Sequence, residues 1–563
     1  MTETNQSSGA EAMVRLLSGH GVRHIFGLCG DTSLPFYDAL ARLDHGMDHV
    51  LTRDERHAAY MADAYARVTG RPGVCEGPSG GGATYILPGL VEANESSVPV
   101  LAITTDVATT SAGRFPLTEL DQEALFRPLT KWNGVIDRAE VLPRMVRKAF
   151  RTMTSGRPGS VHLALPFDVQ KAPVLEDDLW ADARFATYPA LPAGPETDAL
   201  EAIADVLLRA ANPVIICGGG VVLAGAEAAL SAVARALGAP VCTTVSGQGS
   251  MADTDPLCAG VVGSNGGRPA IRALVDAADC VFFVGCRAGS VTTERWRSPA
   301  PGTAIVHLDS DPAVIGACYP TEAALVCDAR LGLTALADAL GRCRRTPRDG
   351  AAAVASAMEA KWPAFEALAA STDTPIRPER VVAELNSALP PSAIICADPG
   401  TPCPYFSAWY RWPEAGRHFI TNRAHGALGY AMGASIGAQI ARPDARVVCA
   451  MGDGSFGMSV GELETVKRLG LPITFIVFSN SVFGWIKAGQ KSGFDARYFS
   501  VDFTRTDHAA VAAAYGIKSH TVSDPAELGG VLRRAIADDN PVLVDVLTQP
   551  LQDAAAPVSE WVA

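Results

Sequence analysis

The chain has 563 residues, of which 48% are hydrophobic and 19% charged, and its formal net charge is −13. The length predicts about three domains, and the acidic balance argues against a nucleic-acid or anionic-membrane partner. The N-terminus, MTETNQSSGAEAM, has no basic region followed by an apolar core, and no run of about 18 apolar residues occurs, so we expect neither a signal peptide nor a membrane span. Thirteen cysteines without a CxxC pair predict buried free thiols in a reducing cytoplasm, not a disulfide frame or a zinc site.

Short apolar runs alternate with helical patterns along most of the chain. In chain order, the predicted strands are RHIFGL, DHVLT, GVCEG, VPVLAITT, PVIICGG, APVCTTV, DCVFFVG, AIVHLDS, SAIICAD, RVVCAMG, LPITFIVF and PVLVDVL. Continuous apolar strands separated by helices indicate parallel sheets covered on both faces. The Pro- and Ala-rich segment FATYPALPAGPETD and the region 344–380 interrupt this rhythm and are predicted connectors. We therefore predict three doubly wound, mostly parallel α/β domains over residues 1–187, 188–350 and 351–563.

The last predicted domain contains a βαβ unit. Its first strand is Val447–Met451, which GDGS follows, and helical spacing runs from Ser459 to Leu469. The second strand starts at Ile473 and ends before Ser479-Asn480. Because the two strands of a βαβ unit are parallel, Asp453 and Asn480 are expected at the same carboxyl edge of the sheet, where ligands bind in open α/β folds.

These residue types suit a magnesium ion. One carboxylate, one amide oxygen and a nearby backbone carbonyl are hard oxygen donors, and Mg²⁺ held in this way keeps room for phosphate oxygens. Gly452 and Gly454 would let a phosphate approach the backbone, with the amides of Ser455 and Phe456 facing it. The alternative is a simple GDGS turn that Asn480 caps.

The order GDGSF, a spacer and SN resembles the diphosphate-binding motif of thiamine-diphosphate enzymes, except that Ser479 replaces the first Asn of the family pattern. The resemblance implies that Asp453, Asn480 and the main-chain oxygen of Val482 hold Mg²⁺. A second stretch, TRDERHAAYMADAYARVTGRPGV, is similar to the family segment whose glutamate contacts N1′ of the cofactor's aminopyrimidine, which implicates Glu55. A carboxylic acid that shares a proton with this nitrogen stabilises the imino tautomer that activates the cofactor.

The resemblance extends over essentially the whole chain. GVRHIFGLCGD, GRPGSVHLALPFDVQ, HLDSDP and NRAHGALGYAMGASIGAQIARPD each resemble a family segment, and the three ranges correspond to pyrimidine-binding, central and diphosphate-binding domains. The last segment implies that the Gly426 carbonyl meets the 4′-amine and that Leu428 is the wedge bending the cofactor; DPGTPC implies that Gly400 and Thr401 line the diphosphate. In this family Glu55 and the GDG loop would come from different subunits, which implies a homodimer or homotetramer.

Among these enzymes the chain most resembles acetolactate synthase (the acetohydroxyacid synthase large subunit), which decarboxylates a 2-keto acid and transfers the remaining fragment to an acceptor. LTELDQEALFRPLTKWN resembles a stretch at the substrate end, which implicates Thr118 and Lys131 together with Gly30, and pyruvate is the expected donor. Asp31 follows Gly30 as an acid does in simple keto-acid decarboxylases, where it helps to protonate the product. The His-His pair of those enzymes is missing, so carboligation is favoured, and Asp31 is either catalytic or a helix N-cap.

Several alternatives stay open. They are a non-ligating 2-keto acid decarboxylase, a sulfoacetaldehyde acetyltransferase, and an acyl-CoA enzyme such as oxalyl-CoA decarboxylase, in which Arg287, Arg295 and Arg297 would hold ADP unless they form ion pairs. A non-catalytic binding protein would be expected to have lost Glu55 or a metal ligand. CGGGVVLAG fails the dinucleotide fingerprint at Leu223, and FAD in the central domain is left open but not indicated. His425 either contacts substrate or is structural.

Overall fold

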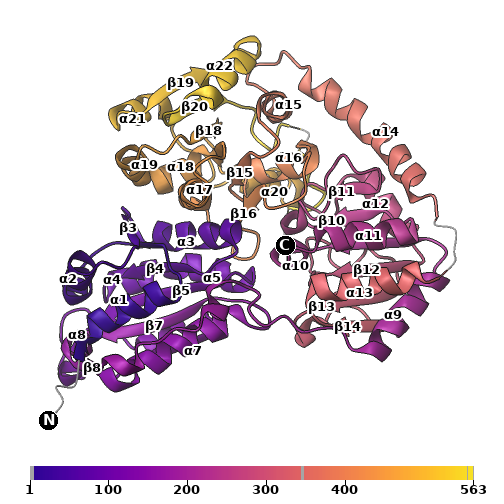
Figure 1. The fold of residues 1–563 in the computed structure, drawn as a ribbon. Helices are drawn as coiled ribbons and strands as arrows, with labels where there is room; N and C mark the ends of the chain where they lie inside the picture. Colours follow the sequence, from indigo (N-terminus) through magenta and orange to yellow (C-terminus); the bar gives the residue numbers. More distant parts are fainter. Residues whose placement is uncertain (1–5, 344–347, 555, 562–563) are drawn as a thin grey trace. The chain divides into compact units, whose positions relative to one another are not determined.

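The computed structural model of the chain describes residues 6–343, 348–554 and 556–561, and it contains three six-stranded parallel sheets (Figure 1). The predicted fold class, three doubly wound α/β domains, is confirmed. The strands of the three sheets fall inside the three predicted ranges, whose boundaries themselves stay predictions. The chain divides into two compact units. The first comprises the described residues up to Leu191 with Ala424–Pro443 and Ser459–Leu469, and the second comprises the remaining described residues.

The sheet of the first unit has a helix layer on each face. In spatial order its strands are β3 (Asp48–Leu51), β2 (His24–Gly27), β4 (Gly73–Gly77), β5 (Val100–Asp106), β7 (Val161–Pro166) and β6 (Trp132–Val135). Val74 of β4 lies in the core with α1 (Gly9–Gly19), α2 (Leu34–Arg42) and α7 (Leu142–Thr154). Neighbouring strand residues point to opposite faces. Gly73 therefore faces α3 (Glu55–Thr69), where a Cβ on Gly73 would lie 2.1 Å from the Ala62 oxygen.

Helix α17 (Tyr430–Ala441) packs closely along α3 because it presents small residues. A Cβ on Gly437 would lie only 2.2 Å from the main-chain oxygen of Met61. A buried ion-pair network fixes the same packing: Arg67 bonds Asp63 at 2.9 Å and Glu92 at 3.1 Å. The beginning of the α17 segment is thereby tied to α3 and α5 (Leu87–Glu95), since Glu92 also accepts from the backbone amides of Ala424 and His425.

Gly437→Ala is expected to destabilise the protein by about 1–3 kcal/mol, because the added methyl must displace the backbone of α3. The measurement is the denaturant midpoint followed by circular dichroism. Gly341→Ala is the matched control, because a Cβ on this helical glycine meets nothing within 4 Å and the substitution raises helix propensity. An unchanged midpoint for Gly437→Ala would show that the two helices do not pack in this register.

The second unit holds the other two sheets. The strands of the central sheet are β11 (Cys258–Val261), β10 (Val241–Thr243), β9 (Pro213–Cys217), β12 (Cys280–Val284), β13 (Ala304–Asp309) and β14 (Ala323–Val326). Those of the last sheet are β16 (Phe419–Thr421), β15 (Ile394–Ala397), β17 (Val447–Gly452), β18 (Thr474–Ser479), β20 (Val542–Leu547) and β19 (Lys518–Val522). Helices α9 (Thr197–Arg209), α11 (Glu227–Leu237) and α13 (Ala329–Gly341) pack against the central sheet, and α15 (Pro378–Ala388), α16 (Pro402–Trp409) and α22 (Pro525–Ala537) against the last one.

Two predicted segments differ from the structure. Residues 344–347 of the predicted connector 344–380 lie outside the described residues. Most of the remainder is one helix of 20 residues, α14 (Gly350–Ala369) (Figure 1). The Ala-rich sequence favours this helix even though Pro363 lies inside it. The predicted helix from Ser459 to Leu469 is instead a 3-10 turn (Val460–Glu462) and α19 (Leu463–Leu469), and a first helix, α18 (Asp453–Ser459), precedes them. Gly470, at φ +61°, ends the second helix as predicted.

All 13 cysteines are free thiols, and ten of them are buried, as predicted. Among the described residues, no helix has both the length and the apolar character needed to cross a membrane. The first five residues of the N-terminus, to which the signal-peptide prediction also refers, lie outside the described residues.

Candidate active site

Asp453 and Asn480 lie together at the carboxyl edge of the last sheet. Strands β17 and β18 are parallel neighbours with Gly452 opposite Phe478, so the residues that follow them emerge side by side. The Oδ2 atom of Asp453 accepts hydrogen bonds from the amides of Asn480 at 2.8 Å and Ser481 at 2.5 Å. The predicted juxtaposition is confirmed, and the alternative of a GDGS turn is wrong because Gly452 ends β17 and Asp453 begins α18.

The surroundings of Asp453 fit a bound cation. Its side chain is buried, and burial is the largest cause raising the pKa of its carboxyl group, against backbone amides that lower it. The Nδ2 atom of Asn480 is also buried, and it has no hydrogen-bond partner among the described residues. A desolvated carboxylate beside an unsatisfied amide is costly unless another group completes the site. These two residues therefore fit the Mg²⁺ and phosphate oxygens that the sequence predicts.

The glycines of the GDG segment have different roles. A Cβ on Gly454 would lie 2.7 Å from the ring of Phe483, so packing excludes a side chain there. A Cβ on Gly452 would meet nothing within 4 Å, which leaves open space beside Asp453. Ser455 is buried in the first turn of α18. The open side of the segment is thus at Gly452.

Three further predicted residues belong to the same sheet edge. Gly400 and Thr401 lie between β15 and α16, and β15 pairs with β17. Val482 follows Ser481, which has φ +59°, and the side chain of Val482 is buried. All residues predicted to hold the diphosphate and Mg²⁺ therefore surround the carboxyl ends of β15, β17 and β18, which we call the diphosphate half-site.

Glu55 is the first residue of α3 in the first unit. Asp54 caps this helix by accepting from the amide of Arg56 at 2.8 Å. The side chain of Glu55 is only 6% exposed, and glycines make room for it: a Cβ on Gly77 would lie 3.3 Å from its Cγ atom, and one on Gly82 would lie 3.0 Å from Oε1. Glu55 therefore projects over the loop that follows β4.

Burial raises the pKa of the Glu55 carboxyl group, and the nearby negative charges of Asp54 and Glu76 raise it further. A raised pKa keeps the protonated form present to a higher pH than for an ordinary glutamate. This state suits the predicted role, in which the side chain shares a proton with a ring nitrogen.

Gly426 and Leu428 lie in the segment that leads into α17. Gly426 has φ +75°, a conformation that side chains disfavour, and Leu428 is partly buried. The backbone amides of Ala424 and His425 are fixed by Glu92. Glu92 of α5 thus gives His425 a structural backbone contact, and the contacts of Gly426 and Leu428 with a cofactor stay predictions.

Two of the predicted substrate residues border the loop after β4. A Cβ on Gly30 would lie 2.4 Å from Pro78, and the Thr118 hydroxyl bonds that of Ser79 at 2.7 Å. Thr118 itself has φ +70°. Because Glu55 lies over the same loop, Gly30, Thr118 and Glu55 form one group, which we call the glutamate half-site.

Asp31 and Lys131 differ from their predictions. Gly30, not Asp31, is the N-cap of the short 3-10 helix, so the N-cap alternative for Asp31 is wrong, and its carboxylate is exposed. Lys131 precedes β6 and thus lies at the amino end of that strand. Its Nζ donates to three main-chain oxygens at 2.6–2.7 Å, those of Thr152, Ser155 and Arg157. This position argues against a substrate contact and gives Lys131 a structural role at the end of α7.

The sequence interpretation missed Glu76, a fully buried carboxylate on β4. Tyr37 donates a hydrogen bond to it, and His49 lies 3.5 Å from the same oxygen. Gly27 on the neighbouring strand makes room, since a Cβ there would lie 2.3 Å from Glu76 Oε1. The signal was a glutamate inside the apolar strand GVCEG, and its consequence is the electrostatic effect on Glu55 described above.

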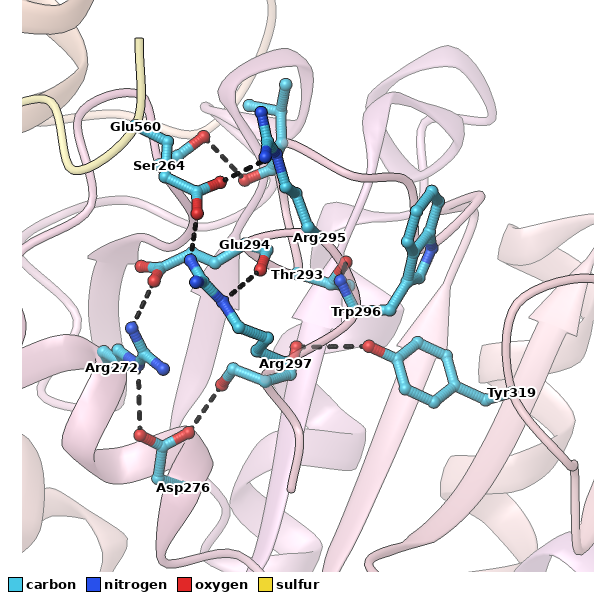
Figure 2. Close-up of polar contacts among 12 residues, drawn as sticks. Ser264, Arg272, Asp276, Thr293, Glu294, Arg295, Trp296, Arg297, Tyr319 and Glu560 are labelled. Carbon is cyan, nitrogen blue, oxygen red and sulfur yellow. Dashed lines mark hydrogen bonds and ion pairs between the residues drawn. The ribbon is translucent and has the colours of Figure 1, made fainter. Parts of the chain in front are cut away.

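Two of the three arginines considered for an acyl-CoA ligand are engaged in ion pairs. Figure 2 shows Arg295 and Arg297 directed at Glu560, and the Arg295–Glu560 distance is 3.5 Å. Arg297 also donates to the main-chain oxygen of Glu294 at 2.9 Å, while the Glu294 carboxylate pairs with Arg272 (Figure 2). These two arginines therefore form the ion pairs that the sequence analysis left as the alternative to an ADP site.

Comparison with known proteins gives three consecutive matches. Models described as the thiamine pyrophosphate enzyme N-terminal TPP binding domain, central domain and C-terminal TPP binding domain match residues 7–125, 200–336 and 400–546. A probable acetolactate synthase large subunit of Methanococcus aeolicus is 33% identical, with 96% of this chain and 92% of that protein covered. The acetolactate synthase isozyme 2 large subunit of Escherichia coli is 32% identical, with 97% and 96% covered.

Proposed function

The chain belongs to the thiamine pyrophosphate enzyme family and is a thiamine-diphosphate-dependent enzyme, and we propose that it is an acetolactate synthase-like carboligase that uses Mg²⁺. The observation that carries the cofactor part of the proposal is the buried Asp453 carboxylate bonded to the Asn480 amide. The choice of carboligation, with pyruvate as the donor, is supported by the full-length similarity to acetolactate synthase large subunits. We further propose a cytoplasmic location, supported by the free thiols.

In the diphosphate half-site, Asp453, Asn480 and the main-chain oxygen of Val482 would hold Mg²⁺. The cation would offset the charge that burial disfavours on Asp453, and the unsatisfied Asn480 amide group would gain a partner in the same complex. Gly400, Thr401, Gly452, Gly454 and Ser455 would line the diphosphate. These residues would hold the diphosphate end of the cofactor, and the residues of the glutamate half-site would contact its reactive end.

In the glutamate half-site, Glu55 would hold a proton between its carboxyl group and N1′ of the aminopyrimidine. Gly426 would accept a hydrogen bond from the 4′-amine, and Leu428 would press against the cofactor as an apolar wedge. When bound, thiamine diphosphate supplies the carbon nucleophile that attacks the keto acid and the electron sink that permits loss of CO₂. The chain's own contribution is the proton at Glu55, held there by the raised pKa.

The substrate end is proposed at the loop after β4, where Gly30 and Thr118 lie beside Glu55. A non-ligating decarboxylase is the second candidate, because the exposed carboxylate of Asp31 adjoins Gly30, with Oδ1 accepting from the amide of Thr32 at 2.9 Å. In that reaction Asp31 would deliver a proton to the product carbon, and an aldehyde would leave. In carboligation the same carbon bonds to the acceptor instead.

We also propose that the active form is a homodimer or homotetramer in which Glu55 of one subunit and Asp453 of another complete each site. The proposal is supported by the presence of the two half-sites in different compact units of the chain. Each dimer would then contain two equivalent sites.

The test is a titration of purified protein with Mg²⁺ and thiamine diphosphate in the presence of pyruvate, with CO₂, acetolactate and acetaldehyde measured separately. We expect one CO₂ per acetolactate, because two pyruvate molecules yield these two products. Dialysis against a chelator should abolish turnover, and Mg²⁺ should restore it. CO₂ with free acetaldehyde would replace the proposal by the decarboxylase, and cofactor binding without turnover of pyruvate would overturn the choice of donor.

A further inference from the structure

A cavity of about 220 Å³ lies in the second unit, and none of its lining residues belongs to either half-site. Strand β11, helix α14 and the C-terminal part of α16 with the residues after it contribute its lining. The apolar lining includes Val354, Met358 and Trp362, and the polar lining includes Asp253, Lys361 and Tyr410. The mechanism proposed above uses none of these side chains.

Lys361 is an unpaired buried cation facing this cavity. Lys361 is only 8% exposed, and no hydrogen bond or ion pair joins its ammonium group to any residue that the structure describes. Nζ lies 4.7 Å from the centre of the Trp362 ring, and a Cβ on Gly260 would lie 3.5 Å from it. Burying an ammonium group without a partner is costly, so its presence beside a cavity points to an anionic ligand.

Asp253 does not fill that role. Its Oδ1 atom accepts from the thiol of Cys258 at 3.3 Å, and its Oδ2 atom accepts from the amide of Trp412 at 2.8 Å. No Asp253 oxygen lies within the 4.0 Å of Lys361 Nζ that an ion pair requires. Both oxygens of Asp253 are therefore committed to the wall of the cavity.

Two acidic and two basic residues line the cavity, and the second acid, Asp255, is already paired with Arg235 at 2.6 Å. Besides Lys361, the basic lining residue is Arg411, whose guanidinium group lies 3.7 Å from the centre of the Trp362 ring. Arg268, which does not line the cavity, also acts electrostatically on Lys361. Burial, partly offset by Asp253, lowers the pKa of Lys361 to about 8. Neither lining carboxylate therefore pairs with Lys361, and the thiol of Cys258 adds no charge because burial and Asp253 raise its pKa.

We propose that this cavity binds a small organic carboxylate, a monoanion with a short apolar body, whose carboxylate group pairs with Lys361 and whose body lies against Met358 and Trp362. The volume corresponds to about seven water-sized groups at roughly 30 Å³ each, so a ligand of about six non-hydrogen atoms fits. An inorganic anion would leave the apolar wall of Val354, Met358 and Trp362 uncovered. Tyr410 also lines the cavity. Its hydroxyl has no hydrogen-bond partner among the described residues, so it offers a second donor for the carboxylate of the ligand.

The probe is isobutyrate, with neutral isobutyramide and inorganic sulfate as matched comparisons, added to the full-length protein. We expect saturable isobutyrate binding by calorimetry and a rise in the denaturation temperature. Isobutyramide and sulfate should bind at least tenfold more weakly. Because binding needs the ammonium form, isobutyrate affinity should fall as the pH rises through about 8.

Lys361→Met keeps the length of the side chain and removes the charge, so it should weaken isobutyrate binding at least tenfold. The same substitution should raise the denaturation temperature of the ligand-free protein, because it removes an unpaired buried cation, and this readout separates loss of binding from loss of folding. Lys518→Met, at an exposed lysine paired with Asp538, is the control and should bind like the unmodified protein. Equal binding by Lys361→Met, equal binding of sulfate, or no saturable binding of isobutyrate would each overturn the proposal.

Discussion

Glu55→Gln is expected to lower kcat by roughly 10²- to 10⁴-fold, the range that a positioned proton-transfer group contributes. Glutamine keeps the size of the side chain in the space left by Gly77 and Gly82, but an amide cannot share a proton with a ring nitrogen. Since burial and two nearby acids already disfavour the charged form of Glu55, the neutral amide should not destabilise the fold. The measurement is kcat at saturating thiamine diphosphate and Mg²⁺.

Glu379→Gln is the matched control for this prediction. Glu379 is also a buried glutamate in the first turn of a helix, α15, and burial likewise raises its pKa. It belongs to neither half-site, so kcat should stay within about threefold of the unmodified value. If Glu55→Gln behaved like Glu379→Gln, the assignment of the proton-sharing role to Glu55 would be wrong.

Asp453→Ala is expected to weaken the binding of Mg²⁺ and thiamine diphosphate at least about 100-fold, because it removes a charged ligand of the cation. It also removes the acceptor of the Asn480 and Ser481 amides, so the loop that carries two proposed ligands loses its anchor. Asp453→Asn separates these effects, since an amide oxygen can still accept from the loop but lacks the charge. Calorimetric titration with thiamine diphosphate at fixed Mg²⁺ measures both variants.

The control for the aspartate series is Asp524→Asn. Asp524 caps α22 by accepting from the amide of Ala526, and asparagine caps helices about as well. Cofactor affinity should therefore be unchanged in this variant. Cofactor binding by Asp453→Ala with ordinary affinity would remove Asp453 from the proposed magnesium site.

Mixing Glu55→Gln subunits with Asp453→Asn subunits tests the proposed assembly. A dimer of one Glu55→Gln and one Asp453→Asn subunit would contain one intact site if each site takes Glu55 and Asp453 from different subunits. Random exchange makes about half of the dimers mixed, so about a quarter of the unmodified activity should return. If dimers that have been shown to exchange subunits recover no activity, each active site takes Glu55 and Asp453 from the same chain.

Most interior strands could be predicted from the sequence because burial on both faces demands continuous apolar runs, as in PVIIC of β9 and VVCAM of β17. The exception is β7 (VHLALP), in which the polar His162 interrupts the run. The strands absent from the prediction include β6, β11, β14, β16 and β19, which all lie at the edge of a sheet. Edge strands pair on one side only, and these are short or partly exposed. Strands β6 (WNGV) and β19 (KSHTV) carry no continuous apolar run, and the run of β14 (AALV) is only four residues long, so the pattern that identifies interior strands does not find them.

The candidate site was predictable where topology determines it. Asp453 and Asn480 meet because they end parallel neighbouring strands, and spacing along the chain reveals such neighbours. The substrate role predicted for Lys131 does not fit its position, because its sequence context says nothing about the three carbonyls at the end of α7 that its Nζ reaches. Glu76 and Lys361 were missed because a buried charge looks like any other polar residue until the packing around it is known.

Pro363 lies in α14 two positions after Lys361, and it cannot donate the backbone hydrogen bond that would close its turn of the helix. The oxygen of Glu359 therefore lacks the usual helical partner on the turn that carries Lys361. Backbone segments with missing internal hydrogen bonds open with a smaller free-energy cost than regular helix and exchange their amide hydrogens faster. The wall of the cavity thus includes a turn of α14 that has one helical hydrogen bond fewer, and we expect its amide hydrogens to exchange faster than those of the neighbouring turns.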